Sequence, residues 1–448
     1  TTSGSGTTTS SSGASTSTPS DPAFYVATDG NDSWAGDLAA PNAAGTDGPF
    51  ATLARAEHAM ENSSVKTTYV EAGTYKLTSA LTLTAADDGE TWSYYAPNGV
   101  NTAVLDGGGS LSPVISINGG SSNITIDGIK VQNFGQIGID AGGEGGETVV
   151  TNITIENCDV GNGGISGNTT AGILFENVTN STIANNYVHN MQGMGISLYS
   201  YYSGESLNGD VIENNVVLNT VQGLSDGGAI YVDMDGSGAS GGSVAIKDNF
   251  VRDYGASGQT DAHGVYLDDN ASNVTVTGNV IGPPTIGAGG NSQSAYLAHN
   301  GANDVFSGNI VDLGSSGQTF AAVWYQDGGS GMSGNTFTDN IVVSDFTGSE
   351  HTSFSGVTGY TFYENSAGSN FTIADNVYYN YTGGQVLTNG PAASDSSPIF
   401  ENPQLSGDLY TVATSSPAFS SAASFKAIAG VWGPSGFTIP TSTNASDT

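Results

Sequence analysis

The segment NITIDGIKV, at residues 123–131, recurs in altered form eight more times along the chain. Every copy keeps one apolar residue in the same place, between 28 and 36 residues after the previous one. These anchor residues are Ile126, Ile155, Ile183, Ile212, Ile246, Val276, Phe306, Phe337 and Ile373. A short β-rich unit repeated at this period cannot bury its apolar face alone and must stack on its neighbours. The sequence therefore predicts an all-β solenoid, a single-stranded right-handed parallel β-helix.

The last seven copies carry an asparagine three positions after the anchor. These asparagines are Asn186, Asn215, Asn249, Asn279, Asn309, Asn340 and Asn376. The first two copies have Ile129 and Cys158 in this place. An inward asparagine at a bend can adopt left-handed backbone geometry and hydrogen-bond to its equivalents in adjacent coils. We therefore expect an asparagine ladder with a structural role, and a buried, inert thiol at Cys158.

Both ends of the chain lack the repeat. Residues 1–20 are rich in Ser, Thr and Gly, a composition typical of a flexible, disordered linker. The β-helix domain is expected at 21–437, closed by a C-terminal cap that begins with SPIFENPQLSGDLY, and a flexible tail is expected at 438–448. Because such linkers are common in exported modular proteins, we expect a secreted, extracellular protein.

One helix is predicted, in the segment PFATLARAEHAM at residues 49–60. Thr52 is a suitable N-cap, and Leu53, Ala56 and Met60 fall on one face. A solenoid exposes its core and strand edges at its ends unless something covers them. We therefore expect this short amphipathic helix to plug the N-terminal end.

The charge balance excludes several classes of partner. The 448 residues include 7 Lys and Arg against 42 Asp and Glu, which gives a net charge of −35. So few basic residues cannot form a surface that follows phosphates, so nucleic-acid binding is not expected. Anionic membranes are disfavoured for the same reason, and no apolar run approaches the ~20 residues of a membrane span. A single cysteine leaves no intrachain disulfide.

A second strand precedes the asparagine-bearing strand in six of the repeats. Its forms are GILFE (172–176), GISLY (195–199), AIYVD (229–233), GVYLD (264–268), SAYLA (294–298) and AVWYQ (322–326). Alternation directs the third and fifth residues of each form to solvent. The third residues are Leu174, Ser197, Tyr231, Tyr266, Tyr296 and Trp324, and the fifth are Glu176, Tyr199, Asp233, Asp268, Ala298 and Gln326.

Two of these repeats match closely: DGGAIYVD (226–233) and DAHGVYLD (261–268). Their shared spacing stacks Asp226 on Asp261, Tyr231 on Tyr266 and Asp233 on Asp268. Adjacent strands lie ~4.8 Å apart, and like charges at that distance repel. A shared proton, a cation or a substrate must therefore compensate.

Three explanations of the paired carboxylates remain open. Asp233 and Asp268 could be the general acid and the nucleophile or base of glycoside hydrolysis, their repulsion raising one pKa. Alternatively, Ca²⁺ could bind among the four carboxylates Asp233, Asp235, Asp268 and Asp269. The third explanation is that they are solvated surface groups. The hydrolase explanation requires no cofactor.

The aromatic column favours a carbohydrate ligand, because sugar rings lay their apolar faces on aromatic rings. The expected platform is Tyr231, Tyr266, Tyr296 and Trp324, flanked by Tyr199, Tyr201 and Tyr202. A tyrosine stack that only stabilises the sheet is the alternative. The other candidate groups near the pair are Asp226, Asp261, His263, His299, Gln326 and Asp327. His263, with Asp261, could assist proton transfer or be a packed core histidine.

The opening FYVATDGNDSWAG, the segment DGPFATLARA and the closing SPIFENPQLSGDLY resemble those of extracellular β-helix carbohydrate-active enzymes, the pectin-lyase-like superfamily. This resemblance extends over nearly all of the chain after residue 20. It implies a polysaccharide-degrading enzyme, and glycosidases of this kind carry catalytic acids on neighbouring coils, as Asp233 and Asp268 would be. Lyases of the superfamily use a Lys or Arg base, and Lys247 and Arg252 are the only bases near the acidic coils.

Our leading hypothesis is a secreted glycoside hydrolase acting on a neutral or weakly charged polysaccharide. The alternatives are a polysaccharide lyase or uronate epimerase using His263 and Tyr266 or Ca²⁺, and a non-catalytic carbohydrate-binding or adhesin solenoid. A monomer or a trimer is compatible with a rod-like solenoid.

Overall fold

The computed structural model describes most of the chain between residues 22 and 441. The described ranges are 22–95, 103–142, 148–164, 170–235, 242–256, 261–285, 293–315, 321–326, 332–345, 362–364, 371–383, 395–407, 410–421, 425, 428, 430 and 432–441. The predicted linker at 1–20 lies outside them. Within these ranges, every helix is too short or too polar to cross a bilayer.

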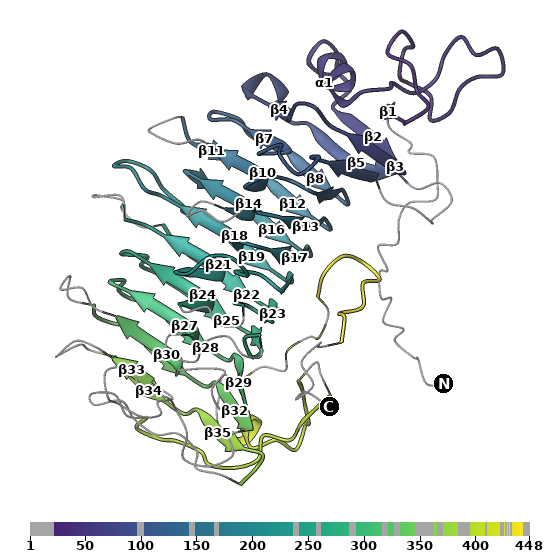
Figure 1. Cartoon of the computed structure of the whole chain (residues 1–448). Helices are drawn as coiled ribbons and strands as arrows, with labels where there is room; N and C mark the ends of the chain where they lie inside the picture. The colour runs from purple at the N-terminus through teal and green to yellow at the C-terminus, as the bar shows by residue number, and fades with distance from the viewer. Residues whose placement is uncertain are drawn as a thin grey trace, which may run out of the picture.

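The coils of the chain stack along one axis, and their strands form three long parallel sheets (Figure 1). The twelve-stranded sheet contains β1 (Phe24–Val26), β2 (Thr67–Glu71), β5 (Thr91–Tyr95), β8 (Thr125–Asp127), β12 (Thr154–Glu156), β16 (Thr182–Ala184), β19 (Val211–Glu213), β22 (Val244–Lys247), β25 (Val274–Thr277), β28 (Val305–Ser307), β31 (Thr336–Thr338) and β34 (Thr372–Ala374). The eleven-stranded sheet contains β3 (Gly73–Lys76), β6 (Ala103–Asp106), β9 (Lys130–Gln132), β13 (Asp159–Gly163), β17 (Tyr187–Met191), β20 (Val216–Leu218), β23 (Phe250–Arg252), β26 (Val280–Ile281), β29 (Ile310–Ser315), β32 (Ile341–Asp345) and β35 (Val377–Asn380).

The third, ten-stranded sheet carries the candidate site. It contains β4 (Leu81–Leu83), β7 (Ile115–Ile117), β10 (Ile137–Gly142), β14 (Ala171–Glu176), β18 (Met194–Tyr199), β21 (Gly227–Asp233), β24 (Ala262–Asp268), β27 (Ser294–His299), β30 (Ala321–Gln326) and β33 (Phe362–Glu364). Short elements outside the three sheets are α1 (Leu53–Glu61), the 3₁₀ turn η1 (Ala85–Asp87), α2 (Ala418–Ser421), the parallel pair β11 (Val150–Thr151) and β15 (Val178–Thr179), and the antiparallel pair β36 (Leu405–Ser406) and β37 (Thr411–Val412).

The nine anchor residues form one unbroken column in the twelve-stranded sheet. Ile126 pairs with Ile155, and this pairing continues coil by coil to Phe337 and Ile373. Every anchor is buried, while its neighbours on the strand are partly exposed in most coils. This period-2 burial confirms the parallel β-helix that the repeat predicts.

The asparagine ladder is present, with one difference from the prediction. From Asn215 onward, each side-chain oxygen accepts hydrogen bonds from the backbone and side-chain amides of the asparagine in the preceding coil, as Asn279 does from Asn249 at 2.9 Å each. Asn186 begins the ladder and accepts from the Cys158 backbone amide. The left-handed residue, however, is the one before the ladder asparagine, such as Asp248 with φ 55°. The turn therefore directs the asparagine inward, and the asparagine itself needs no unusual backbone. Cys158 is buried as expected, and burial raises the pKa of its thiol.

The predicted N-terminal helix is confirmed in its bounds and contacts. The Thr52 hydroxyl accepts a hydrogen bond from the Arg55 amide at 3.2 Å, and Leu53, Ala56 and Met60 are buried. This α1 helix contacts β1, β2 and β4 at the N-terminal end of the solenoid (Figure 1). Burying the apolar face of α1 covers the core that the first coil would expose.

The C-terminal segment lies along the eleven-stranded sheet. Phe425 and Trp432 belong to a buried cluster with outward apolar residues of that sheet, including Phe250, whose ring centroid is 5.3 Å from that of Trp432. Arg252 donates a hydrogen bond to the Pro440 carbonyl at 2.8 Å. The segment thus covers a side of the solenoid as well as following its last coil. The first part of the tail expected at 438–448 docks here, and residues 442–448 lie outside the described part.

Removing one ladder amide should destabilise the fold measurably. Asn279→Ala leaves the buried Asn249 amide and the Ile246 carbonyl without their partners. Each such orphaned group costs about 1–3 kcal/mol, so the free energy of unfolding should fall by about 2–4 kcal/mol. Chemical denaturation measures this change. The exposed strand substitution Thr372→Ala is the control, and an equal loss in both variants would contradict a special role for the ladder.

Candidate functional site

Strands β21 and β24 bring the two predicted carboxylates together. Tyr231 pairs with Tyr266 and Asp233 with Asp268 in the strand register, as the repeated spacing predicts. The turns before both strands also match, because the Asp226 amide donates to the Asp261 carbonyl at 2.8 Å. Asp226 and Asp261 both adopt left-handed backbone geometry, with φ 68° and 64°. The register on which the site hypothesis depends is therefore confirmed.

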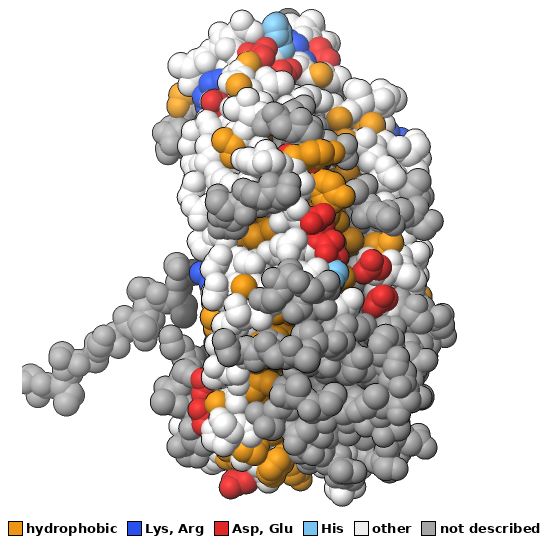
Figure 2. All heavy atoms as spheres, turned by 90° about the vertical axis from the view of Figure 1, so that its left-hand side faces the viewer, with side chains coloured by type: hydrophobic (Ala, Val, Ile, Leu, Met, Phe, Trp, Pro, Cys, Tyr) orange, Lys and Arg blue, Asp and Glu red, His pale blue; other side chains and the backbone are white. Residues whose placement is uncertain are grey.

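A cleft of about 540 Å³ lies over this part of the ten-stranded sheet. Its lining residues are Ile137, Asp140, Leu174, Glu176, Met194, Tyr199, Tyr201, Tyr202, Asp226, Tyr231, Asp233, Asp268 and Asp269. Figure 2 shows acidic side chains and a histidine gathered midway along this face. The cleft extends from the paired carboxylates toward the N-terminal coils. Sequence reasoning did not assign Asp140 and Glu176 to the site, although Glu176 occupies the same outward column as Asp233.

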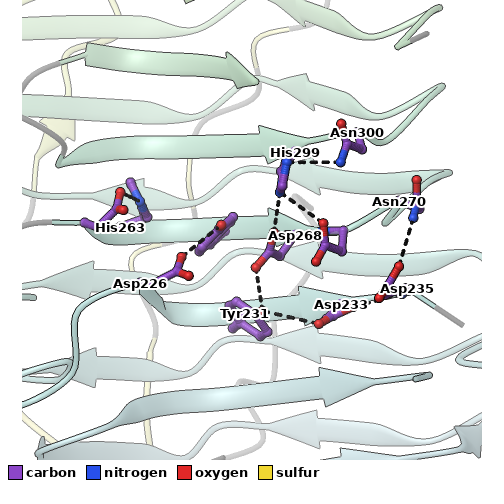
Figure 3. Close-up of polar contacts among 12 residues, drawn as sticks. Asp226, Tyr231, Asp233, Asp235, His263, Asp268, Asn270, His299 and Asn300 are labelled. Carbon is purple, nitrogen blue, oxygen red and sulfur yellow. Dashed lines mark hydrogen bonds and ion pairs between the residues drawn. The ribbon is translucent and has the colours of Figure 1, made fainter. Parts of the chain in front are cut away.

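The Tyr231 hydroxyl lies between the two carboxylates. It donates a hydrogen bond to Asp268 Oδ2 at 2.7 Å and lies 3.4 Å from Asp233 Oδ2 (Figure 3). The two carboxylate oxygens therefore cannot be further apart than these two distances added together. A protonated Asp233 could in turn donate to the Tyr231 oxygen. The Tyr231 hydroxyl therefore bridges the two carboxylates and keeps them from direct contact.

The two carboxyl groups are electrostatically unlike. Burial raises the pKa of Asp233 to about 7, and the charge of Asp268 adds to this, against the hydrogen bond from the Asp235 amide. Burial also acts to raise the pKa of Asp268, but hydrogen bonds from His299 and Tyr231 outweigh it and leave that pKa below its usual value. The predicted divergence of the pair is present. Burial, more than repulsion from Asp268, raises the pKa of Asp233, and the hydrogen bonds to Asp268 are what separate the two carboxyl groups.

His299 is the partner that separates the two pKa values. Its Nδ1 lies 2.7 Å from Asp268 Oδ1 and 3.2 Å from Asp269 Oδ1. The hydrogen bond with Asp268 raises the pKa of His299, so the imidazolium form is favoured beside the ionised carboxylate. The pair Asp268–His299 is therefore an ion pair at the edge of the cleft, and Figure 3 shows both side chains facing each other from neighbouring strands.

The predicted alignment of β27 is wrong by one residue. Tyr296 pairs with Val265 and Val323, so it points inward, and it is 1% exposed. Its ring packs against Phe306 at 4.5 Å between centroids. Aligning AYLAH rather than SAYLA with GVYLD would have placed His299 in the column of Asp268. The prediction aligned Tyr296 with Tyr231 and Tyr266 because all three are tyrosines. An aromatic ring is compatible with either face of the sheet, so this identity did not determine the register.

The predicted exposed aromatic stripe is also wrong for the coils that contain β21 and β24. Tyr231 and Tyr266 are 6% and 4% exposed, and their rings meet edge to face at 5.1 Å between centroids. Tyr199 continues this packing against Tyr231 at 5.3 Å. Of the aromatic residues expected here, Tyr201 and Tyr202, on the flank, are the exposed ones at the cleft, at 52% and 41%. The alternative of a stabilising tyrosine stack therefore describes the strand tyrosines better.

The predicted residues Asp261 and His263 lie in the turn before β24 and in the first part of that strand. His263 is fully buried, with Nδ1 2.8 Å from Ser294 Oγ and Nε2 3.3 Å from Asp261 Oδ1. It supports the Tyr266 ring, whose hydroxyl donates to Asp226 Oδ1 at 3.1 Å. His263 and Asp261 therefore lie beside the cleft and do not line it.

Two further predicted residues lie on β30, and one follows it. Gln326 pairs with His299 and is partly exposed. The backbone of Trp324 pairs with that of Leu297, which continues the outward column of Tyr266. The Trp324 side chain and Asp327 lie outside the described part of the chain.

The predicted Ca²⁺ ligands do not form one group. Among the described residues, Asp268, Asp269 and His299 have donor atoms within 4.8 Å of one another, without Asp233 or Asp235. The Asp268 Oδ1 atom already accepts from His299 and from the Asp269 amide at 2.7 and 2.8 Å. Ca²⁺ prefers oxygen ligands, and the imidazole of this group is a nitrogen donor already held in an ion pair with the two carboxylates, so the group does not suit it. We therefore assign no metal-dependent step to this cleft.

Comparison with known proteins supports the fold. Residues 113–311 match the protein-family model described as the right-handed β-helix region. The chain is a right-handed parallel β-helix. No curated protein sequence matches it.

Several solved structures share this β-helix fold. A glycoside hydrolase superposes with a TM-score of 0.57 at 11% identity, over 80% of this chain and 96% of that one. The A-module of the mannuronan C-5 epimerase AlgE6 of Azotobacter vinelandii gives 0.49 at 15% identity, over 78% and 94%. The pectate lyase Pel9A gives 0.46 at 12%, over 91% and 93%. Carbohydrate-active enzymes of the pectin-lyase-like type are thus its structural neighbours, and at these identities the likeness concerns the fold alone.

The raised pKa of Asp233 makes a stability prediction with a definite sign. An acid whose pKa rises on folding stabilises the fold below its unfolded pKa, near 3.9, and this stabilisation is lost as the pH rises to about 7. Asp233→Asn removes the cost of a buried charge and keeps an acceptor for the Asp235 amide. Its free energy of unfolding should therefore exceed that of the wild type by about 2–4 kcal/mol at pH 8 and match it near pH 4. Urea denaturation at both pH values measures this, and an equal difference at both would contradict the assignment.

Proposed function

We propose that the protein is a secreted glycoside hydrolase that cleaves a neutral or weakly charged polysaccharide with retention of configuration. The observation that carries this proposal is the asymmetric pair, Asp233 and Asp268. One carboxyl is buried with a pKa near neutrality, and the other is held ionised by a histidine and a tyrosine. Two carboxyl groups whose environments separate their pKa values are the pattern expected of an acid and a nucleophile.

Each residue then has a defined part in the reaction. Asp268 Oδ2 attacks the anomeric carbon, while protonated Asp233 gives its proton to the departing glycosidic oxygen. The resulting glycosyl ester on Asp268 is opened by water, whose proton returns to Asp233. His299 holds Asp268 in its ionised form and in position, and the Tyr231 hydroxyl orients the Oδ2 atom that attacks.

The spacing of the pair supports retention. In inverting glycosidases the carboxyl groups are ~6.5–9.5 Å apart, which leaves room for a water molecule, whereas in retaining enzymes they are ~5–5.5 Å apart. The two Oδ2 atoms are both within 3.4 Å of the Tyr231 hydroxyl oxygen. Because one of these distances is only 2.7 Å and the other is 3.4 Å, the two Oδ2 atoms are closer together than the ~6.5 Å lower limit for inversion.

The charges around the cleft support a substrate without carboxylates. Its described lining includes six acidic side chains, Asp140, Glu176, Asp226, Asp233, Asp268 and Asp269, and neither Lys nor Arg. A uronate polymer would bring further negative charge to this surface, and a lyase or epimerase must neutralise that charge at the reacting sugar. The exposed rings of Tyr201 and Tyr202 offer an apolar face on which a sugar ring can lie.

Substituting the two carboxylates separately should reveal their different roles. Asp233→Asn should lower kcat/KM on polysaccharide by about 10²–10⁴, with a much smaller loss on an aryl glycoside whose leaving group needs no proton. Asp268→Ala should lose turnover on both substrates, and added azide should restore it by occupying the space of the carboxylate. Asp37→Asn, an exposed carboxylate on the N-terminal loop, is the matched control.

Product analysis separates this proposal from its alternatives. A hydrolase generates reducing ends alone, whereas a lyase generates an unsaturated sugar that absorbs in the ultraviolet. A carbohydrate-binding solenoid would bind and give neither product. Full activity in Asp233→Asn and Asp268→Ala, or an unsaturated product from the wild-type chain, would refute the proposal.

Removing His299 should change the pH profile in one direction. Without its hydrogen bond, the pKa of Asp268 rises, so the acidic limb of kcat/KM should move to higher pH in His299→Ala. The basic limb, which reports loss of the Asp233 proton, should remain near pH 7. The exposed His58→Ala is the control. A shift of the basic limb alone would indicate that His299, and not Asp233, supplies the proton.

A further inference from the structure

A second group of carboxylates lies at the N-terminal end of the solenoid, away from the cleft. Glu57 and Glu61 occupy successive turns of α1, and Asp87 is the last residue of η1. One oxygen of each of these three carboxylates lies within 4.8 Å of the other two. Three like charges this close repel one another strongly unless a proton or a cation is shared among them.

Asp87, the buried member of the group, has one carboxylate oxygen without a hydrogen-bond partner among the described residues. Asp87 is fully buried, and its Oδ2 caps η1 by accepting from the Thr84 amide and hydroxyl at 2.7 and 3.2 Å. Within the described residues, the Asp87 Oδ1 atom is buried without a hydrogen-bond partner. Burying a carboxylate oxygen in this way costs free energy that the capping bonds alone do not offset.

The surroundings add more negative charge than positive charge. Burial raises the pKa of Glu57, and the charges of Asp87 and Glu61 raise it further. Glu90 is fully buried nearby, and burial followed by the charge of Asp87 raises its pKa to about 8. Lys66 lies 3.7 Å from Glu90, and His58 lies 3.4 Å from Glu61. These are the described basic groups that contact the carboxylates, and Lys66 pairs with Glu90.

We propose that Glu57, Glu61 and Asp87 bind Ca²⁺. An all-carboxylate donor set selects a hard cation rather than zinc or copper. Ca²⁺ binds oxygens at 2.3–2.6 Å in flexible geometry, which suits carboxylate oxygens that lie within 4.8 Å of one another, whereas Mg²⁺ demands a near-ideal octahedron. The exposed side of the glutamates leaves room for water to complete the coordination. The ion joins α1 to the coil beneath it, so it fastens the helix that closes the end of the solenoid.

This assignment is independent of the proposed catalytic function and can be tested on the full chain. The chain is stripped of divalent ions with a chelator, desalted and titrated with CaCl₂ by calorimetry. One site is expected, and millimolar CaCl₂ should raise the Tm by about 2 °C or more. The double variant Glu57→Gln/Glu61→Gln alters only partly exposed helix residues and should bind at least ~10-fold more weakly, with no rise in Tm.

Asp269→Asn is the matched control, because Asp269 belongs to the other described acidic group, in the cleft. Its Ca²⁺ affinity and its rise in Tm should equal those of the wild type. Absence of binding to the wild-type chain overturns the proposal, and would indicate that the carboxylates share a proton. Undiminished binding in the double variant, or loss of binding in Asp269→Asn, also overturns it.

Discussion

The vertical register of the coils is the constraint on which every other feature depends. Each ladder asparagine after Asn186 accepts from both the backbone and the side-chain amide of the asparagine in the preceding coil, so a displaced coil would break two buried hydrogen bonds at once. The left-handed residue before it fixes the bend at the same point in every repeat. A slip of one residue would also turn every apolar anchor to the solvent. The ladder and the anchors therefore also determine the register of the outward columns in the ten-stranded sheet.

A parallel solenoid places equivalent residues directly above one another. Repeating a charged residue in adjacent coils therefore causes electrostatic repulsion, and this repulsion can shift the pKa values of the stacked groups. Asp233 over Asp268 would repel in any coil, and the sequence repeats the aspartate only once before replacing it with His299. The neighbouring coils are therefore asymmetric: one carboxylate faces a histidine above it, and the other is buried without such a partner. This difference between coils, more than any property of the aspartates, shifts their pKa values in opposite directions.

The sequence was sufficient for the fold because the fold is periodic. The anchors and the ladder follow from a spacing that recurs in nine and seven copies, and the N-terminal helix follows from its N-cap and its single apolar face. The site was predictable only where two repeats were nearly identical, as in DGGAIYVD and DAHGVYLD. At β27 a single ambiguous copy decided the alignment, and Tyr296 suited the wrong face as well as the right one. The pKa separation could not be predicted either, since it depends on the burial of Asp233 and on the coil position of His299.

The three sheets of the solenoid differ in their structural roles. The bend between the twelve- and eleven-stranded sheets contains the ladder, with Asn249 between β22 and β23. The eleven-stranded sheet has an apolar outer face, with residues such as Phe250 and Val280 in vertical contact, and the C-terminal segment covers it. An uncovered apolar face of that length would favour association with other chains. The outward columns of the ten-stranded sheet instead carry carboxylates, tyrosines and a histidine around the cleft, and Tyr231, Asp233 and Asp268 are nearly buried there. The candidate site therefore lies on a polar sheet face and not on the apolar face that the C-terminal segment covers.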